Sequence, residues 1–134
     1  MMKVNSENLE LKRAVIEVIG GCNYTCQMCP QSTGRGVGFT RTMGFELFET
    51  ILDQLVELGS PLVQLEGSGE PTMLRDLPKY IQACTDRGLS TYMFTNGARL
   101  HGDYMRQVID AGIGMIRFSI IGHDATTYKK WMSK

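Results

Sequence analysis

The sequence predicts an α/β fold in which four short strands alternate with four helices around a parallel sheet. Apolar runs of strand length recur along the chain, segments with helical periodicity lie between them, and Gly or Pro marks most of the boundaries. Strands are expected to start near residues 15, 62, 90 and 115, so the later repeats are about 25 to 28 residues long. A repeat of that length fits right-handed β-α-β crossovers, which connect parallel neighbours.

Short apolar runs bounded by turn residues indicate buried strands. We expect strands at Val15–Ile19, Leu62–Leu65, Thr91–Phe94 and Met115–Ile121, of which the first is interrupted only by Glu17.

Helical periodicity begins at Phe45 and ends at Leu58, where Gly follows. Asp76, Asp103 and Asp124 are candidate N-caps for three later helices. The segment 22–43 shows no periodicity and is expected to be a long loop, with a flexible glycine-rich part at 34–38.

Length and charge exclude several classes of protein. A chain of 134 residues can form a single domain, with 14 basic and 14 acidic residues and therefore no net charge. This balance gives no nucleic-acid signature. No apolar run approaches the roughly 18 residues that a membrane span needs, and residues 1–13 are too polar for a signal peptide. A cytoplasmic protein that does not enter a membrane is expected.

Three of the four cysteines, Cys22, Cys26 and Cys29, lie within eight residues in a C-x3-C-x2-C pattern. In a chain expected to be cytoplasmic, this spacing favours metal binding over disulfides. Zinc usually needs four ligands, whereas a 4Fe–4S cluster held by three thiolates leaves one iron open to a small molecule. Cys84 falls on the apolar face of a predicted helix and is expected to be a core residue.

The polar motifs follow successive strands, and the carboxyl ends of parallel strands are where α/β folds place their sites. The cysteines follow the first strand, the turn 67–71 (GSGEP) the second and the turn 95–97 (TNG) the third. Together these motifs resemble the radical S-adenosylmethionine (SAM) superfamily, from about Val15 to the end of the chain, in the style of its SPASM or Twitch branch.

The resemblance implies an incomplete parallel (β/α) barrel with about four of the six βα units of a radical SAM partial barrel. Residues 1–13 would then be an N-terminal extension, and residues 14–134 the truncated N-terminal part of the core domain of a larger enzyme.

The resemblance also implies a reaction, in which a reduced 4Fe–4S cluster cleaves SAM to a 5′-deoxyadenosyl radical that abstracts hydrogen from a substrate. Its cofactors would be the cluster and SAM, and its partners an electron donor such as flavodoxin or ferredoxin and an unidentified peptide or small molecule. Cys22, Cys26 and Cys29 would bind the cluster. The SAM contacts that the resemblance implies are Met28, Gly67, Ser68, Gly69, Glu70, Asn96 and Ser119.

Several alternatives stay open. Glu70 could be a solvated turn carboxylate, Asn96 an ordinary turn residue and Ser119 a structural residue. The whole chain could be an iron–sulfur or zinc binding module, or an inactive remnant. No residue acting on the substrate can be named.

Overall fold

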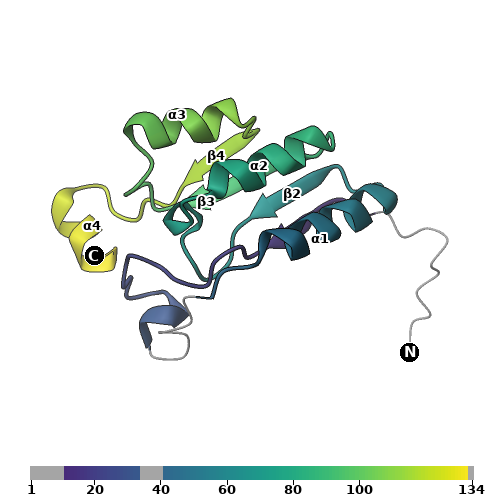
Figure 1. The fold of residues 1–134 in the computed structure, drawn as a ribbon. Coiled ribbons are helices and arrows are strands. Elements are labelled where there is room, and N and C mark those ends of the chain that lie inside the picture. Colours follow the sequence, from purple (N-terminus) through teal and green to yellow (C-terminus); the bar gives the residue numbers. More distant parts are fainter. Residues whose placement is uncertain (1–10, 34–40, 133–134) are drawn as a thin grey trace, which may run out of the picture.

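A computed structural model describes residues 11–33 and 41–132 of the chain (Figure 1). Strands and helices alternate through most of the chain. In order, the elements are β1 (Ala14–Ile16), η2 (Pro30–Thr33), α1 (Phe45–Glu57), β2 (Leu62–Leu65), η3 (Pro71–Met73), α2 (Leu77–Asp86), β3 (Ser90–Thr95), α3 (Gly102–Asp110), β4 (Met115–Phe118) and α4 (Ala125–Trp131).

The four strands form one parallel sheet in the order β1-β2-β3-β4. Ile16 pairs with Leu65, Leu65 pairs with Met93, and Met93 pairs with Ile116, so the strands end close to one another. The predicted parallel α/β fold is therefore confirmed. The carboxyl ends of all four strands open on the same edge of the sheet, which is where the motif residues follow.

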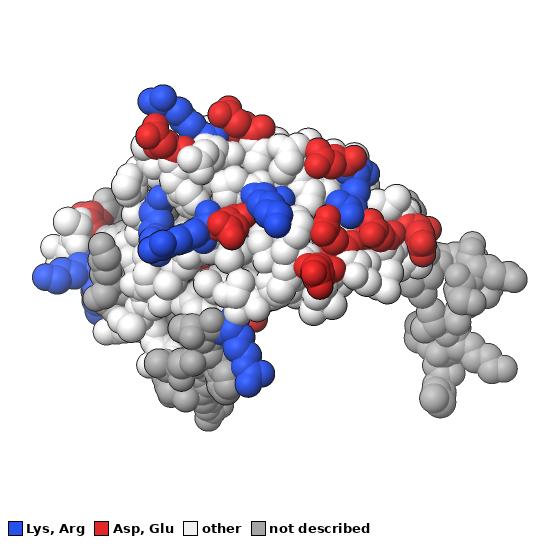
Figure 2. All heavy atoms as spheres, viewed as in Figure 1, with Lys and Arg blue, Asp and Glu red and all other residues white. Residues whose placement is uncertain are grey.

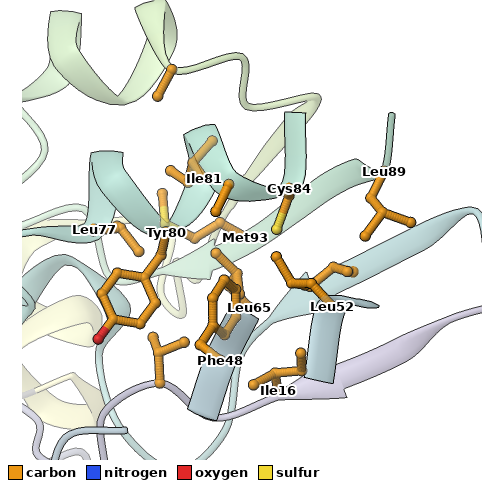
Figure 3. Packing of buried hydrophobic residues seen from close by; sticks show 14 of the residues in the cluster. Ile16, Phe48, Leu52, Leu65, Leu77, Tyr80, Ile81, Cys84, Leu89 and Met93 are labelled. Atoms are coloured by element: carbon orange, nitrogen blue, oxygen red, sulfur yellow. The ribbon is translucent and has the colours of Figure 1, made fainter. Parts of the chain in front are cut away.

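Helices α1, α2 and α3 lie side by side along the sheet, and the main core fills the space between them and the strands (Figures 1 and 3). Phe48 and Leu52 of α1 and Leu77 and Ile81 of α2 are fully buried. They meet Met93 and its neighbours on the strands (Figure 3). The periodicity predicted these inward faces because residues three and four apart share one side of a helix.

The first strand is shorter than expected. It ends at Ile16, and Ile19 instead forms an isolated antiparallel bridge with Thr42. The strand ends because residues 18–20 no longer pair with β2 and instead pair with residues 41–43. The Met43 amide donates to the Val18 carbonyl at 2.9 Å. This antiparallel contact ties residues 18–20, which precede the cysteines, to the segment that leads into α1. The fourth strand likewise ends early, at Phe118.

Two of the three predicted caps need correction. Asp76 holds the N-cap position of α2 but makes no side-chain capping bond, and Asp103 lies inside the first turn of α3, whose N-cap residue is His101. Asp124 caps α4 as expected, since its Oδ1 accepts from the Thr127 amide at 2.7 Å in a capping box. The glycine-rich segment predicted to be flexible lies within 34–40, outside the described residues.

Charges of both signs are interspersed over the face that carries the helices, with acidic side chains gathering toward α1 (Figure 2). The viewed face has no broad basic patch, in agreement with the zero net charge. Within residues 11–33 and 41–132, none of the helices is both long and apolar enough to cross a membrane.

Replacement of Phe48, which is fully buried, tests the core. Phe48→Ala should lower the free energy of unfolding by about 3–5 kcal/mol because it removes buried apolar area and leaves a cavity. Urea denaturation followed by circular dichroism measures the loss. Leu47→Ala on the same helix is the matched control, since Leu47 is 56% exposed. Equal losses in the two variants would contradict this packing.

Candidate functional site

A cavity of about 290 Å³ opens at the carboxyl ends of the strands. This volume is near the lower end of the roughly 300–1,000 Å³ that is usual for ligand pockets. Every strand contributes to its wall through the segment that follows it. The lining residues are Cys22, Tyr24, Cys26, Met28, Cys29, Glu66, Gly67, Gly69, Glu70, Phe94, Thr95, Asn96, Ser119, Ile121 and Met132.

The three clustered cysteines all line this cavity, and each is free and half-buried. A tight turn brings the last two together, because the Cys29 amide donates to the Cys26 carbonyl at 3.0 Å. Cys22 Sγ accepts from the Tyr24 amide at 3.4 Å. The backbone therefore folds this short loop so that three thiols face one space.

Burial raises the pKa of the Cys22 thiol, and the nearby charges of Glu70 and Cys29 raise it further. The pKa of Cys26 is raised by burial first and then by the other two cysteines. Both raised pKa values favour the protonated thiols of Cys22 and Cys26 in the unliganded chain. Any metal or cluster that binds here must displace those protons, because the thiolate is the ligand form.

The donor set fits a cluster better than a single ion. Within the described part of the chain, no three His, Cys, Asp or Glu side chains are gathered so as to hold one metal ion. A zinc ion needs its ligands at about 2.0–2.3 Å from a single centre. A 4Fe–4S cluster is several atoms wide and accepts thiolates spread around a cavity wall. Three thiols around a cavity, without a fourth ligand gathered among the described residues, leave room for a cluster with one open iron.

Glu70 is buried, with 3% of its surface exposed, and its carboxylate is fully engaged. Oε1 accepts from the Thr72 amide at 3.1 Å and from the hydroxyls of Thr72 and Thr95 at 2.6 Å each. Oε2 accepts from the Asn96 amide at 2.7 Å. The open alternative of a solvated turn carboxylate is therefore wrong. Glu70 is one of the residues that line the cavity, and its hydrogen bonds connect the turn after β2 to the end of β3.

Asn96 links the third strand to the cysteine loop. Its Nδ2 donates to Asn23 Oδ1 at 2.9 Å and lies 3.9 Å from Cys22 Sγ, while its Oδ1 accepts from the Ala98 amide at 3.0 Å. The last bond is the local turn contact expected of an Asn-Gly pair. The first two are long-range, so Asn96 also holds the cysteine loop in place.

The structure brings nearly all of the predicted SAM contacts to the cavity. Met28, 44% exposed, lines it beside the cysteines, and Ser119 lines it at the end of β4, where its amide donates to the Thr95 carbonyl at 2.8 Å. Gly67 and Gly69 also line it. Ser68 does not, and its amide donates instead to Glu17 Oε1.

The two glycines fit because there is no room for a side chain at either position. A Cβ at Gly67 would overlap the Glu17 side chain, and a Cβ at Gly69 would overlap the Ile19 carbonyl. The turn after β2 thus lies directly against the segment that leads to the cysteines, and the Glu70 amide donates to the Gly21 carbonyl at 2.8 Å.

The fourth helix also supports the cysteine loop, which the sequence motifs did not reveal. The Gln27 amide donates to the Trp131 carbonyl at 3.1 Å, and the hydroxyls of Tyr24 and Tyr128 are 3.2 Å apart. Both contacts join residues about 104 positions apart, so local periodicity carries no signal for them. Met132, just after α4, completes the cavity wall on this side.

Cys84 is separate from the site, as expected. It is fully buried on α2 in the core (Figure 3), and burial raises the pKa of its thiol to about 11. A neutral, inaccessible thiol is a packing residue and a poor ligand.

With this geometry in place, comparison with known proteins identifies the class. The family model described as the Radical SAM superfamily matches residues 16–134, and the chain belongs to that superfamily. The family resemblance drawn from the motifs is thereby confirmed, whereas assignment to the SPASM or Twitch branch stays a prediction.

Among similar curated proteins, Fe-coproporphyrin III synthase of Methanosarcina barkeri is 27% identical over 108 residues, which are 81% of this chain and 27% of that protein. Probable GTP 3',8-cyclase of Methanococcus maripaludis is 26% identical over 121 residues, 90% of this chain and 40% of that protein. The chain thus spans well under half the length of these relatives.

Among solved structures, Streptococcus suis SuiB bound to S-adenosylmethionine superposes with a TM-score of 0.77 at 20% identity. The match covers 92% of this chain and 28% of SuiB, and it supports the partial-barrel fold. Members of this family are enzymes whose cofactors are a 4Fe–4S cluster and SAM.

Glu70→Gln tests the buried carboxylate. Whichever way the new amide is oriented, its NH2 group must face the backbone N–H of either Thr72 or Asn96, and that N–H loses its acceptor. We expect the free energy of unfolding to fall by about 1–3 kcal/mol, as for a buried donor left unsatisfied. Chemical denaturation measures this, with Glu66→Gln, directly before the turn, as the control. A Glu70 variant as stable as the control would contradict the arrangement.

Proposed function

We propose that this chain binds a 4Fe–4S cluster through Cys22, Cys26 and Cys29 and holds SAM beside it, as the SAM-cleaving part of a radical SAM enzyme. The observation that carries this proposal is the convergence of three free thiols and the glycine turn on one cavity. When bound, the reduced cluster supplies the electron that cleaves SAM to methionine and a 5′-deoxyadenosyl radical, which abstracts hydrogen from a substrate.

The residues around the cavity divide the remaining tasks. Glu70 and Asn96 fix the relative positions of the turn and the cysteine loop through their hydrogen bonds. Gly67 and Gly69 let the turn pack against the Glu17 side chain and the Ile19 carbonyl, which keeps the turn at the cavity wall. Met28 offers an apolar surface suited to the adenine, and Ser119 a hydroxyl suited to the ribose. These roles follow the family pattern, and the cavity positions of the residues support them.

The partners follow from this chemistry. We propose an electron donor of the flavodoxin or ferredoxin type and a substrate that is a peptide or a small molecule. Free thiols that must stay reduced to bind a cluster favour a cytoplasmic location. No side chain of this chain is assigned to the substrate.

Cysteine substitutions test the cluster ligands. Cys22→Ala, Cys26→Ala and Cys29→Ala should each abolish the 4Fe–4S signal after anaerobic reconstitution, because each removes one of only three ligands. Iron and sulfide content together with electron paramagnetic resonance (EPR) of the reduced protein measure the loss. Cys84→Ala is the matched control and should retain the cluster, since Cys84 lies in the core. Zinc bound in place of iron would instead favour the zinc-module alternative.

The addition of SAM tests the open iron. The EPR spectrum of the reduced, reconstituted chain should change when SAM is added, because the amino and carboxylate groups of SAM bind the iron that lacks a cysteine. A cluster that forms but is indifferent to SAM would favour a plain iron–sulfur module, and the absence of any cluster would favour an inactive remnant.

A further inference from the structure

Glu17 reaches across from the end of β1 to the glycine turn after β2. Its Oε1 accepts from the amides of both Ser68 and Gly69, the second at 3.0 Å. This contact follows from the register, because Ile16 pairs with Leu65, which places the next residues of the two strands side by side. The charged residue in the first apolar run is therefore explained by its hydrogen bonds to the amides of Ser68 and Gly69.

The position of Glu17 sets the direction of two backbone carbonyls. In a trans peptide the C=O and the N–H point in opposite directions. Because the amides of Ser68 and Gly69 point toward Glu17, the carbonyls of Gly67 and Ser68 point away from it. In the described part of the chain, neither of these carbonyls accepts a hydrogen bond.

Glu17 and the turn line different hollows. Glu17 lines a second hollow with Gly20, Arg41, Thr42 and Met43. Gly67 and Gly69 line the cavity that holds the three cysteines. The amides of Ser68 and Gly69 are therefore satisfied by Glu17, while the carbonyl of Gly67, a residue of the cavity wall, points away from Glu17 and, among the described residues, is free.

We propose that Glu17 is a positioning residue that, through the Ser68 amide, orients the carbonyl of Gly67 to accept the ammonium group of SAM. This inference rests on the proposed function. A carboxylate behind the turn also polarises the two peptide groups, because hydrogen bonds in a chain strengthen one another. Its negative charge favours a cation on the other side of the turn. Glu17 itself touches neither SAM nor the cluster.

Glu17→Gln removes the charge and keeps the shape and one accepting oxygen. We expect the dissociation constant for SAM, measured by EPR titration of the reduced cluster, to rise about fivefold to tenfold, as a charge-assisted bond becomes a neutral one. Glu17→Ala should raise it further, while the iron content of both variants equals that of the wild type. Glu57→Gln is the matched control, since Glu57 is an exposed glutamate at the end of α1.

A second ligand distinguishes two causes of weaker SAM binding in Glu17→Gln, namely a misoriented carbonyl and general damage to the site. Methylthioadenosine contains the adenosine and sulfur of SAM but has no ammonium group. Its affinity, measured by equilibrium dialysis, should change less than twofold in Glu17→Gln. Equal weakening for SAM and methylthioadenosine would overturn the inference, as would an unchanged affinity for SAM.

The hydrogen bonds can also be tested without any cofactor. In the unliganded chain, Glu17→Gln should move the Ser68 and Gly69 amide proton signals upfield in NMR spectra and speed their hydrogen exchange, whereas Glu57→Gln should leave them unchanged. Amide signals that do not move would overturn this inference and leave the proposed function standing. A wild-type cluster that fails to respond to SAM would overturn the proposed function and this inference with it.

Discussion

The buried carboxylate of Glu70 is the interaction on which the geometry of the site depends. An ionised carboxylate away from water is costly unless it is hydrogen-bonded. None of the ion pairs in the described part of the chain involves Glu70, and four donors from Thr72, Thr95 and Asn96 surround its two oxygens. Because those donors come from η3 and the end of β3, the carboxylate can be satisfied only when both segments are in place.

This dependence extends to the cysteines. Asn96, whose amide Glu70 accepts, donates from its side chain to Asn23 in the cysteine loop. The Glu70 amide in turn donates to the Gly21 carbonyl, one residue before Cys22. Two routes thus connect Glu70 to the first thiol, one through the side chain of Asn96 and one through the backbone. A half-satisfied polar network is worse than an apolar one, so the site is ordered as a unit.

Local patterns predicted the fold and the location of the site. The periodicity of Phe48 and Leu52 indicated α1, and parallel topology then brought the motifs to one edge of the sheet. The burial of Glu70 and the reach of Glu17 could not be predicted in this way, because their partners lie about 25 and 51 residues away and depend on strand register. The only local sign was a charge in the middle of the first apolar run. The contact of α4 with the cysteine loop had no local sign at all.

The backbone of the glycine turn distinguishes this site from a phosphate loop. Glycine loops that cradle phosphates present free N–H groups to the anion. Here the amides of Ser68 and Gly69 donate to Glu17, and that of Glu70 donates to Gly21. With these three amides already used, the turn offers acceptors to the cavity in place of a row of free N–H groups, and acceptors bind cations. The charge of Glu17 acts in the same direction, because a carboxylate bonded to the turn favours a cation over an anion beside it.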